Sequence, residues 1–184
     1  LTTKAYARQQ AKTIDNHRAS VSEQVGPTES GGDNTTHFSI IDQHGNRVAA
    51  TLSINYPFGS GFVAEGTGVL LNDEMDDFSA KTGTANAYGL VGTDANAIAP
   101  YKRPLSSMSP TFIENPNKLM ITGTPGGSRI ISMVLLSLLD FVEGHNAEQI
   151  VSAPRYHHQY LPDQVQIEKD SFSKETITAL QQRG

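Results

Sequence analysis

Four short segments of this sequence carry side chains that could do chemistry, and the first holds a candidate nucleophile. Thr35 lies where a run rich in Ser, Gly, Asn and Asp (residues 15–34) gives way to alternating apolar residues. A threonine that simply begins a strand fits the same pattern, and spacing alone favours that plainer interpretation. The chemical interpretation requires cleavage of the Asn34–Thr35 bond. The freed α-amine, whose pKa is about 7.7–8.0 when unperturbed, could then act as the base that activates the hydroxyl.

The other three segments offer binding groups. Gly126 and Gly127 precede a long apolar run, so their N–H groups could form an oxyanion hole at a helix start, although the pair taken alone favours an ordinary tight turn. Ser106 and Ser107 could hold a carboxylate, or belong to an ordinary Ser- and Pro-rich loop. The acidic run 72–77 could receive an ammonium group. It lacks the spacing and the glycine of an EF-hand, and an exposed acidic loop is the plainer interpretation.

Short elements must position these groups. Strands are predicted at 37–42 and 47–55, joined by the turn 43–46, and again at 111–113 and 119–122, so the sequence contains two hairpins. Residues 79–107 lack apolar periodicity and are predicted to be a long ordered loop. Helices are predicted at 1–14, 129–143, 147–153 and from the cap Ser173 to Gln182, with a strand at 165–168. Helix 129–143 is apolar on most sides and is expected to be buried between a sheet and another layer. This clustering favours an α+β fold.

Composition excludes several classes of protein. The 184 residues suggest one domain, and a formal charge of −5 disfavours nucleic-acid binding. Without cysteine there is no disulfide, no thiolate nucleophile and no Cys-type zinc site. His157 and His158 lack a third-ligand pattern, so no metal site is expected there. The longest apolar stretch, 130–142, is interrupted by polar residues and is too short to span a bilayer.

Six blocks, in this order, resemble the small subunit of γ-glutamyltranspeptidases. They are Thr35–Ser39, Leu70–Ser79, Tyr88–Gly92, Lys102–Pro110, Gly126–Ile131 and Ala153–Arg155. Each block alone is a weak signal, but six in register are specific and raise the chemical interpretations above the plainer ones. Residues 1–34 resemble the C-terminal tail and linker of the large subunit, and residues 35–184 the catalytic small-subunit region.

The resemblance implies a fold and a role for each group. The fold would be an N-terminal nucleophile hydrolase αββα sandwich, incomplete in this chain, from a precursor that cuts itself between Asn34 and Thr35. Thr35 would be the nucleophile and its own α-amine the base. The remaining roles are assigned by position: Gly126 and Gly127 to the oxyanion hole, Asn55, Glu74 and Asp77 to the substrate α-ammonium, and Ser106 and Ser107 to its α-carboxylate. Ser53 stands where many relatives have a threonine that supports the nucleophile.

The activity implied is hydrolysis of γ-glutamyl amides such as glutathione, or transfer of the γ-glutamyl group to an amino acid, without metal or organic cofactor. The family's large subunit, which supplies a carboxylate-binding Arg and half of the fold, would be the partner. The family's small subunit also continues beyond the position of Gly184, so we expect a truncated chain that is weakly active or inactive alone. Relatives are usually exported to the periplasm or the cell exterior. Three alternatives remain open: a cephalosporin or glutaryl acylase, a poly-γ-glutamate depolymerase, and a non-catalytic binding remnant.

Overall fold

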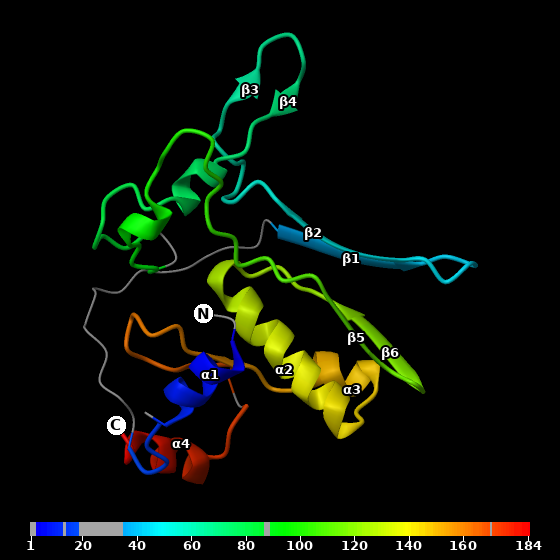
Figure 1. Ribbon diagram of the computed structural model, residues 1–184, viewed down its shortest axis with the longest axis vertical. Coiled ribbons are helices and arrows are strands. Elements are labelled where there is room, and N and C mark those ends of the chain that lie inside the picture. The colour runs from blue at the N-terminus through cyan, green and yellow to red at the C-terminus, as the bar shows by residue number, and fades with distance from the viewer. Residues whose placement is uncertain (1–2, 13, 19–34, 87–88, 170) are drawn as a thin grey trace.

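The protein is a mixture of short helices and two-stranded antiparallel sheets (Figure 1). A computed structural model describes residues 3–12, 14–18, 35–86, 89–169 and 171–184. Its helices are α1 (Lys4–Ala11), α2 (Ile130–Glu143), α3 (Ala147–Ser152) and α4 (Lys174–Gln181). Its strands are β1 (Thr35–Ile41), β2 (Arg47–Ser53), β3 (Val63–Ala64), β4 (Val69–Leu70), β5 (Thr111–Asn115), β6 (Lys118–Thr122), β7 (Tyr156–His157) and β8 (Gln166–Ile167). Much of the predicted linker 15–34 and its Asn34 lie outside the described residues.

The first hairpin confirms the strand prediction. β1 and β2 pair antiparallel from Thr35↔Ser53 to Ile41↔Arg47. At the turn, the Asp42 carboxylate accepts backbone N–H bonds from His44 and Asn46, both at 2.8 Å. Gly45 supplies the left-handed conformation there, with φ 82°. The turn therefore fixes the register, and the register sets Thr35 opposite Ser53.

The second hairpin and its following helix also form as predicted. β5 pairs with β6, and the chain then turns through a 3₁₀ segment, Gly127–Arg129, into α2. β2 lies beside β6, and the Arg47 guanidinium forms an ion pair with Glu114 of β5. Gly123, just after β6, has no room for a side chain, because a Cβ there would lie 2.2 Å from the His37 ring of β1. The two hairpins thus converge where β1 begins, β2 ends and α2 starts (Figure 1).

The expected burial of α2 on all sides is wrong for this chain. α2 contacts β6, β7 and α3, and its Ile130 and Val134 are buried. Four other apolar side chains of the helix are exposed: Ile131 (57 %), Leu135 (52 %), Leu139 (51 %) and Val142 (72 %). The hydrophobic pattern shows how much apolar surface the helix carries, but the strands and helices that the structure describes cover only one face of it.

The segments between the hairpins and after α2 carry little regular structure. Residues 79–107 form the predicted long loop, interrupted by one 3₁₀ turn at Asp94–Asn96, with Ala87 and Tyr88 outside the described residues. After α2, the Asn146 side chain caps α3, and the Ser173 side chain caps α4 as predicted. The segment that follows α1 contacts the segment that follows α4, since Arg183 Nη1 donates to the Asn16 carbonyl at 2.9 Å. None of the described helices has the length and apolar content needed to cross a membrane.

Candidate active site

Thr35 and Ser53 form the starting point of the site. They are cross-strand partners at the open end of the β1–β2 hairpin, where side chains on the same face come close. Thr35 Oγ1 donates a hydrogen bond to Ser53 Oγ at 3.0 Å, and the backbone N–H of Asn55 donates to the same oxygen at 2.9 Å. Ser53 therefore fixes both the predicted nucleophile and the start of the next segment.

Asn55 turns the chain from β2 toward the acidic run. Its φ is 71°, a left-handed conformation that asparagine tolerates better than most residues. The residue is only 5 % exposed, and its Nδ2 donates to the Asp73 carbonyl at 3.3 Å. The N–H of Tyr56 donates to Asp73 Oδ1 at 3.1 Å. Asp73, which the sequence analysis did not single out, thus connects the end of β2 to the carboxylates that follow.

Glu74 and Asp77 place two carboxyl groups side by side. They are three residues apart on the 3₁₀ helix Glu74–Asp77, a geometry in which positions i and i+3 eclipse each other. Burial, which has the largest effect, acts together with a hydrogen bond to Glu74 and the charges of Glu74, Asp76 and Asp73 to raise the pKa of Asp77 to about 7. Glu74 Oε1 is buried and has no hydrogen-bond partner among the described residues. The pair is thus short of a positive charge.

Ser106 and Ser107 lie on the loop that precedes β5. Ser106 Oγ accepts from the N–H of Met108 at 3.2 Å. Ser107 Oγ donates to the Gly127 carbonyl at 2.9 Å, which ties this loop to the glycine pair. Both serines line the same pocket as Glu74, Asp77 and Gly127.

Gly126 and Gly127 adopt conformations that L side chains rarely reach. Their φ angles are 134° and 56°. Gly127 begins the 3₁₀ segment that leads into α2, and the first N–H groups of a helix have no partners within it. The positive end of the helix dipole adds to these donors. The turn interpretation and the oxyanion-hole interpretation are therefore compatible at this position.

One pocket gathers these groups. Its lining includes every predicted site residue except Gly126, which precedes the lining Gly127: Thr35, Ser53, Asn55, Glu74, Asp77, Ser106, Ser107 and Gly127. The lining also includes Leu90, Leu105, Met108, Ser128 and Ile130, which the sequence analysis did not assign. These residues adjoin the predicted motifs, but an apolar or small residue carries no chemical signal in a sequence.

His157 does not line the pocket, but its hydrogen bonds hold neighbouring elements together. The residue is 5 % exposed, its Nδ1 lies 2.8 Å from Ser132 Oγ of α2, and its Nε2 lies 2.8 Å from Gln159 Oε1. Gln159 Oε1 also accepts from Ser128 Oγ at 2.6 Å. This network anchors the first turns of α2 to β7, which keeps the glycine pair in place.

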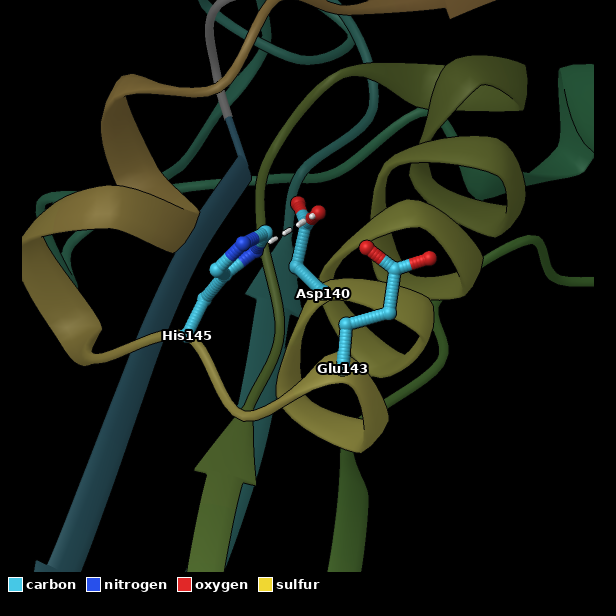
Figure 2. A group of neighbouring side chains, drawn as sticks. All are labelled: Asp140, Glu143 and His145. Carbon is cyan, nitrogen blue, oxygen red and sulfur yellow. Dashed lines mark hydrogen bonds and ion pairs between the residues drawn. The ribbon is translucent and has the colours of Figure 1, made fainter.

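One cluster outside the pocket could hold a cation: Asp140, Glu143 and His145, whose ligand atoms lie within 4.8 Å of one another (Figure 2). Its geometry follows from the end of α2. The N–H of His145 donates to the Asp140 carbonyl and that of Gly144 to Phe141, the bond pattern of a Schellman motif. His145 Nδ1 lies 3.3 Å from Asp140 Oδ1. A histidine near the last carbonyls of a helix is favourable without any metal, so helix capping accounts for the cluster.

The pocket brings together the groups that an acyl-transfer site of the N-terminal nucleophile hydrolase class would need: a hydroxyl at a strand start, a glycine at a helix start and a carboxyl pair. Comparison with known proteins supports the same class. The family model "Gamma-glutamyltranspeptidase" matches residues 1–184, and the chain belongs to this family. Among solved structures, an acivicin-inhibited γ-glutamyltranspeptidase has a TM-score of 0.78 at 49 % identity, covering 81 % of this chain and 80 % of that one. The fold is that of these N-terminal nucleophile hydrolases, of which this chain carries a part.

Two relatives put the chain's length in context. It is 48 % identical to the glutathione hydrolase proenzyme of Escherichia coli K12, over 100 % of this chain and 32 % of that protein. It is 46 % identical to the glutathione hydrolase proenzyme of Pseudomonas sp. A14, over 100 % of this chain and 33 % of that protein. The chain therefore spans about a third of the length of these relatives.

Proposed function

We propose that the protein containing this chain hydrolyses γ-glutamyl amides such as glutathione and transfers their γ-glutamyl group to amino acids. The observation that carries the proposal is the carboxyl pair Glu74 and Asp77 in the same pocket as Thr35, with a buried oxygen of Glu74 unpaired among the described residues. An α-ammonium group supplies the missing charge, because an ion-paired ammonium satisfies buried carboxylates that otherwise lack a partner. Ser106 and Ser107 would bind the α-carboxylate of the same substrate.

The active form requires cleavage between Asn34 and Thr35, because an amide-bonded nitrogen cannot act as a base. This division separates residues 1–34, the tail of a large subunit, from residues 35–184 of a small subunit. The freed α-amine of Thr35 then lies on the same residue as its hydroxyl, and its ordinary pKa is close to neutral pH. A base of that strength is suited to proton transfer at neutral pH.

In the first half-reaction, Thr35 Oγ1 attacks the γ-carbonyl carbon while its proton passes to the α-amine. The negative oxygen of the tetrahedral intermediate accepts hydrogen bonds from the N–H groups of Gly126 and Gly127. The intermediate collapses as the C–N bond breaks, and the leaving amine takes the proton. A γ-glutamyl ester remains on Thr35.

In the second half-reaction, water or the amine of an amino acid attacks this ester. The attacking group loses its proton to the α-amine of Thr35, the ester C–O bond breaks, and Thr35 regains its hydroxyl proton. The products are glutamate or a new γ-glutamyl amide. None of these steps requires an electron acceptor or a metal-bound nucleophile, so the proposed reaction needs no metal or organic cofactor.

A second polypeptide, the large subunit, is the proposed partner. The relatives are named proenzymes and are about three times as long as this chain. The exposed apolar stripe of α2 (Ile131, Leu135, Leu139 and Val142) is a surface that such a subunit would cover. The carboxylate-binding Arg would also come from it. We place the assembled protein in the periplasm or outside the cell, by analogy with the family.

A glutaryl or cephalosporin acylase is the second candidate, because it would use the same nucleophile and glycine pair. The acid pair disfavours it, since an acyl group without an ammonium leaves Asp77 and Glu74 uncompensated. A poly-γ-glutamate depolymerase would share the whole pocket and differ in what lies beyond it.

The proposed nucleophile is tested by labelling and sequencing. The full-length protein is treated with a γ-glutamyl affinity label, and the modified residue is located by mass spectrometry. N-terminal sequencing of the smaller self-cleaved polypeptide gives its first residue. We expect the adduct on Thr35 and a sequence that starts Thr-Thr-His. An adduct elsewhere, or an uncleaved single chain without γ-glutamyl activity, would contradict the proposal and favour an inert binding remnant.

A further inference from the structure

Asn96 connects two parts of the pocket that are far apart in the sequence. It ends the 3₁₀ turn Asp94–Asn96 within the long loop. Its side-chain Nδ2 donates to the Asp77 backbone carbonyl at 2.7 Å, and its Oδ1 accepts from the Leu105 N–H at 3.0 Å. An asparagine amide carries a donor and an acceptor on one short planar group, so these two bonds hold the two segments at a fixed separation.

Asn96 forms two hydrogen bonds with the backbone around Asp77. Besides the bond to the Asp77 carbonyl, the Asn96 carbonyl accepts from the N–H of Ser79 at 3.0 Å. The bond reinforces a parallel bridge between Ser79 and Ala97. The backbone on either side of Phe78 is therefore fixed to one residue, and the Asp77 carboxyl group projects from that fixed backbone.

The hydrogen bond from the Leu105 N–H to Asn96 lies next to the predicted carboxylate-binding hydroxyls. Leu105 directly precedes Ser106, and Ser107 is anchored at its other end by its bond to the Gly127 carbonyl. Asn96 and Gly127 thus hold the serine loop from two directions. Leu105 and Asp77 both line the pocket that contains Thr35.

We propose that Asn96 is a positioning residue that sets the separation between the ammonium-binding carboxyl of Asp77 and the carboxylate-binding hydroxyls of Ser106 and Ser107. This inference rests on the proposed function, which gives these groups their ligands. The α-ammonium and the α-carboxylate of an amino acid are attached to the same carbon, so their partners must be placed to within a fraction of an ångström to bind both at once. A ligand that carries only one of the two groups does not require that separation.

This difference between ligands provides the test. In the full-length protein, Asn96→Ala removes both side-chain bonds, and Asn96→Asp keeps the acceptor for Leu105 but turns an oxygen toward the Asp77 carbonyl. Asn115→Ala is the matched control. Asn115 Oδ1 accepts from the N–H groups of Asn117 and Lys118, both at 2.9 Å, in the β5–β6 turn and outside the pocket lining. KM and kcat are measured with γ-glutamyl-p-nitroanilide. Calorimetry measures binding of L-glutamate, of glutarate, which lacks the ammonium, and of 4-aminobutyrate, which lacks the α-carboxylate.

We expect Asn96→Ala to weaken L-glutamate binding and raise KM by about 10- to 100-fold, as for loss of two positioning hydrogen bonds, with kcat changed less than about threefold. Binding of the two single-group ligands should change by less than about threefold. Asn96→Asp should fall between wild type and Asn96→Ala, and Asn115→Ala should match wild type.

Several results would overturn the inference. They are an unchanged KM in both Asn96 variants, an equal loss of affinity for all three ligands, a loss confined to kcat, or no L-glutamate binding by the wild-type protein. If Asn96→Ala does not fold, Asn96→Asp carries the same comparison. A wild type that binds L-glutamate but does not turn over γ-glutamyl-p-nitroanilide would contradict the proposed function, while the ligand comparison would still decide the role of Asn96.

Discussion

Thr35 and Ser53 occupy the first and last positions of one hairpin and are joined by a hydrogen bond of 3.0 Å between their hydroxyl oxygens. The register of β1 and β2 imposes this pairing, and the turn at the far end of the hairpin sets the register. Ser53 also accepts from the Asn55 N–H, so the same oxygen holds the proposed nucleophile and the residue that begins the proposed substrate-binding segment.

Replacing Ser53 by Ala should therefore slow the chemical step. One hydrogen bond contributes about 0.5–1.5 kcal/mol, so kcat for γ-glutamyl-p-nitroanilide should fall by roughly 2- to 12-fold. Ser53→Thr retains the hydroxyl and should stay close to wild type. Ser60→Ala is a control outside the pocket, since Ser60 Oγ likewise links backbone groups, the Leu71 carbonyl and the Phe62 N–H. An unchanged kcat in Ser53→Ala would show that the contact has no catalytic role.

Substrate binding should depend on pH through Asp77. Burial and neighbouring carboxylates raise its pKa to about 7, and only the ionised form attracts an ammonium group. KM for the γ-glutamyl substrate should be constant above that pH and should rise toward tenfold for each pH unit below it. Asp77→Asn should bind weakly at every pH and lose this dependence. A KM profile that is flat from pH 5 to 8 in the wild type would contradict the assignment.

The same carboxyl group should make the substrate-free protein less stable as pH rises. The folded state holds the Asp77 proton up to about pH 7, whereas the unfolded chain releases it near the ordinary value of 3.8. Between these values the folded state binds more protons, so the free energy of unfolding falls as pH increases and the loss is complete above about 7. Thermal unfolding at pH 5 and pH 8 measures this difference. Asp77→Asn should reduce it, and an equal difference in the variant would locate the effect at another group.

Local elements could be predicted from the sequence because their signals are local. The turn between β1 and β2 and the caps of the later helices depend on residues a few positions apart, and Ser173 caps α4 as its position indicated. The pocket residues were predicted from the six-block resemblance, since a lone Thr35 or Gly127 is better explained by ordinary structure.

The features that could not be predicted depend on segments that meet only in the folded chain. Asn96 lies in a loop without periodicity, and its partners at Asp77 and Leu105 are 19 and 9 positions away. The covering of α2 was misjudged for a related reason. Apolar residues on every side indicate that a helix is covered on every side, but not that the covering comes from the same chain.

Asp77 should also distinguish the two acylase chemistries. The ammonium group of a γ-glutamyl substrate would pair with the Asp77–Glu74 carboxyls, whereas a glutaryl substrate offers no charge to them. Asp77→Asn should therefore lower kcat/KM for γ-glutamyl-p-nitroanilide by at least about tenfold, the effect of losing one charge-assisted hydrogen bond. For glutaryl-p-nitroanilide the change should be less than about threefold. Equal losses on both substrates would mean that Asp77 supports the structure of the pocket but does not bind the substrate ammonium group.

The uncovered stripe of α2 should control association with the second subunit. Leu135 and Leu139 lie one turn apart and are each about half exposed, at 52 % and 51 %. Burying one leucine side chain contributes about 1.5–3 kcal/mol, so a charged residue in its place should weaken association at least tenfold. In the full-length protein, Leu139→Asp should leave self-cleavage detectable on a denaturing gel, while the two polypeptides separate on gel filtration. Leu139→Ile, which keeps the apolar surface, should remain associated. If Leu139→Asp also remains associated at micromolar concentration, this face of α2 is not the contact surface, and other exposed apolar residues, such as Ile40 of β1 and Leu52 of β2, become the candidates.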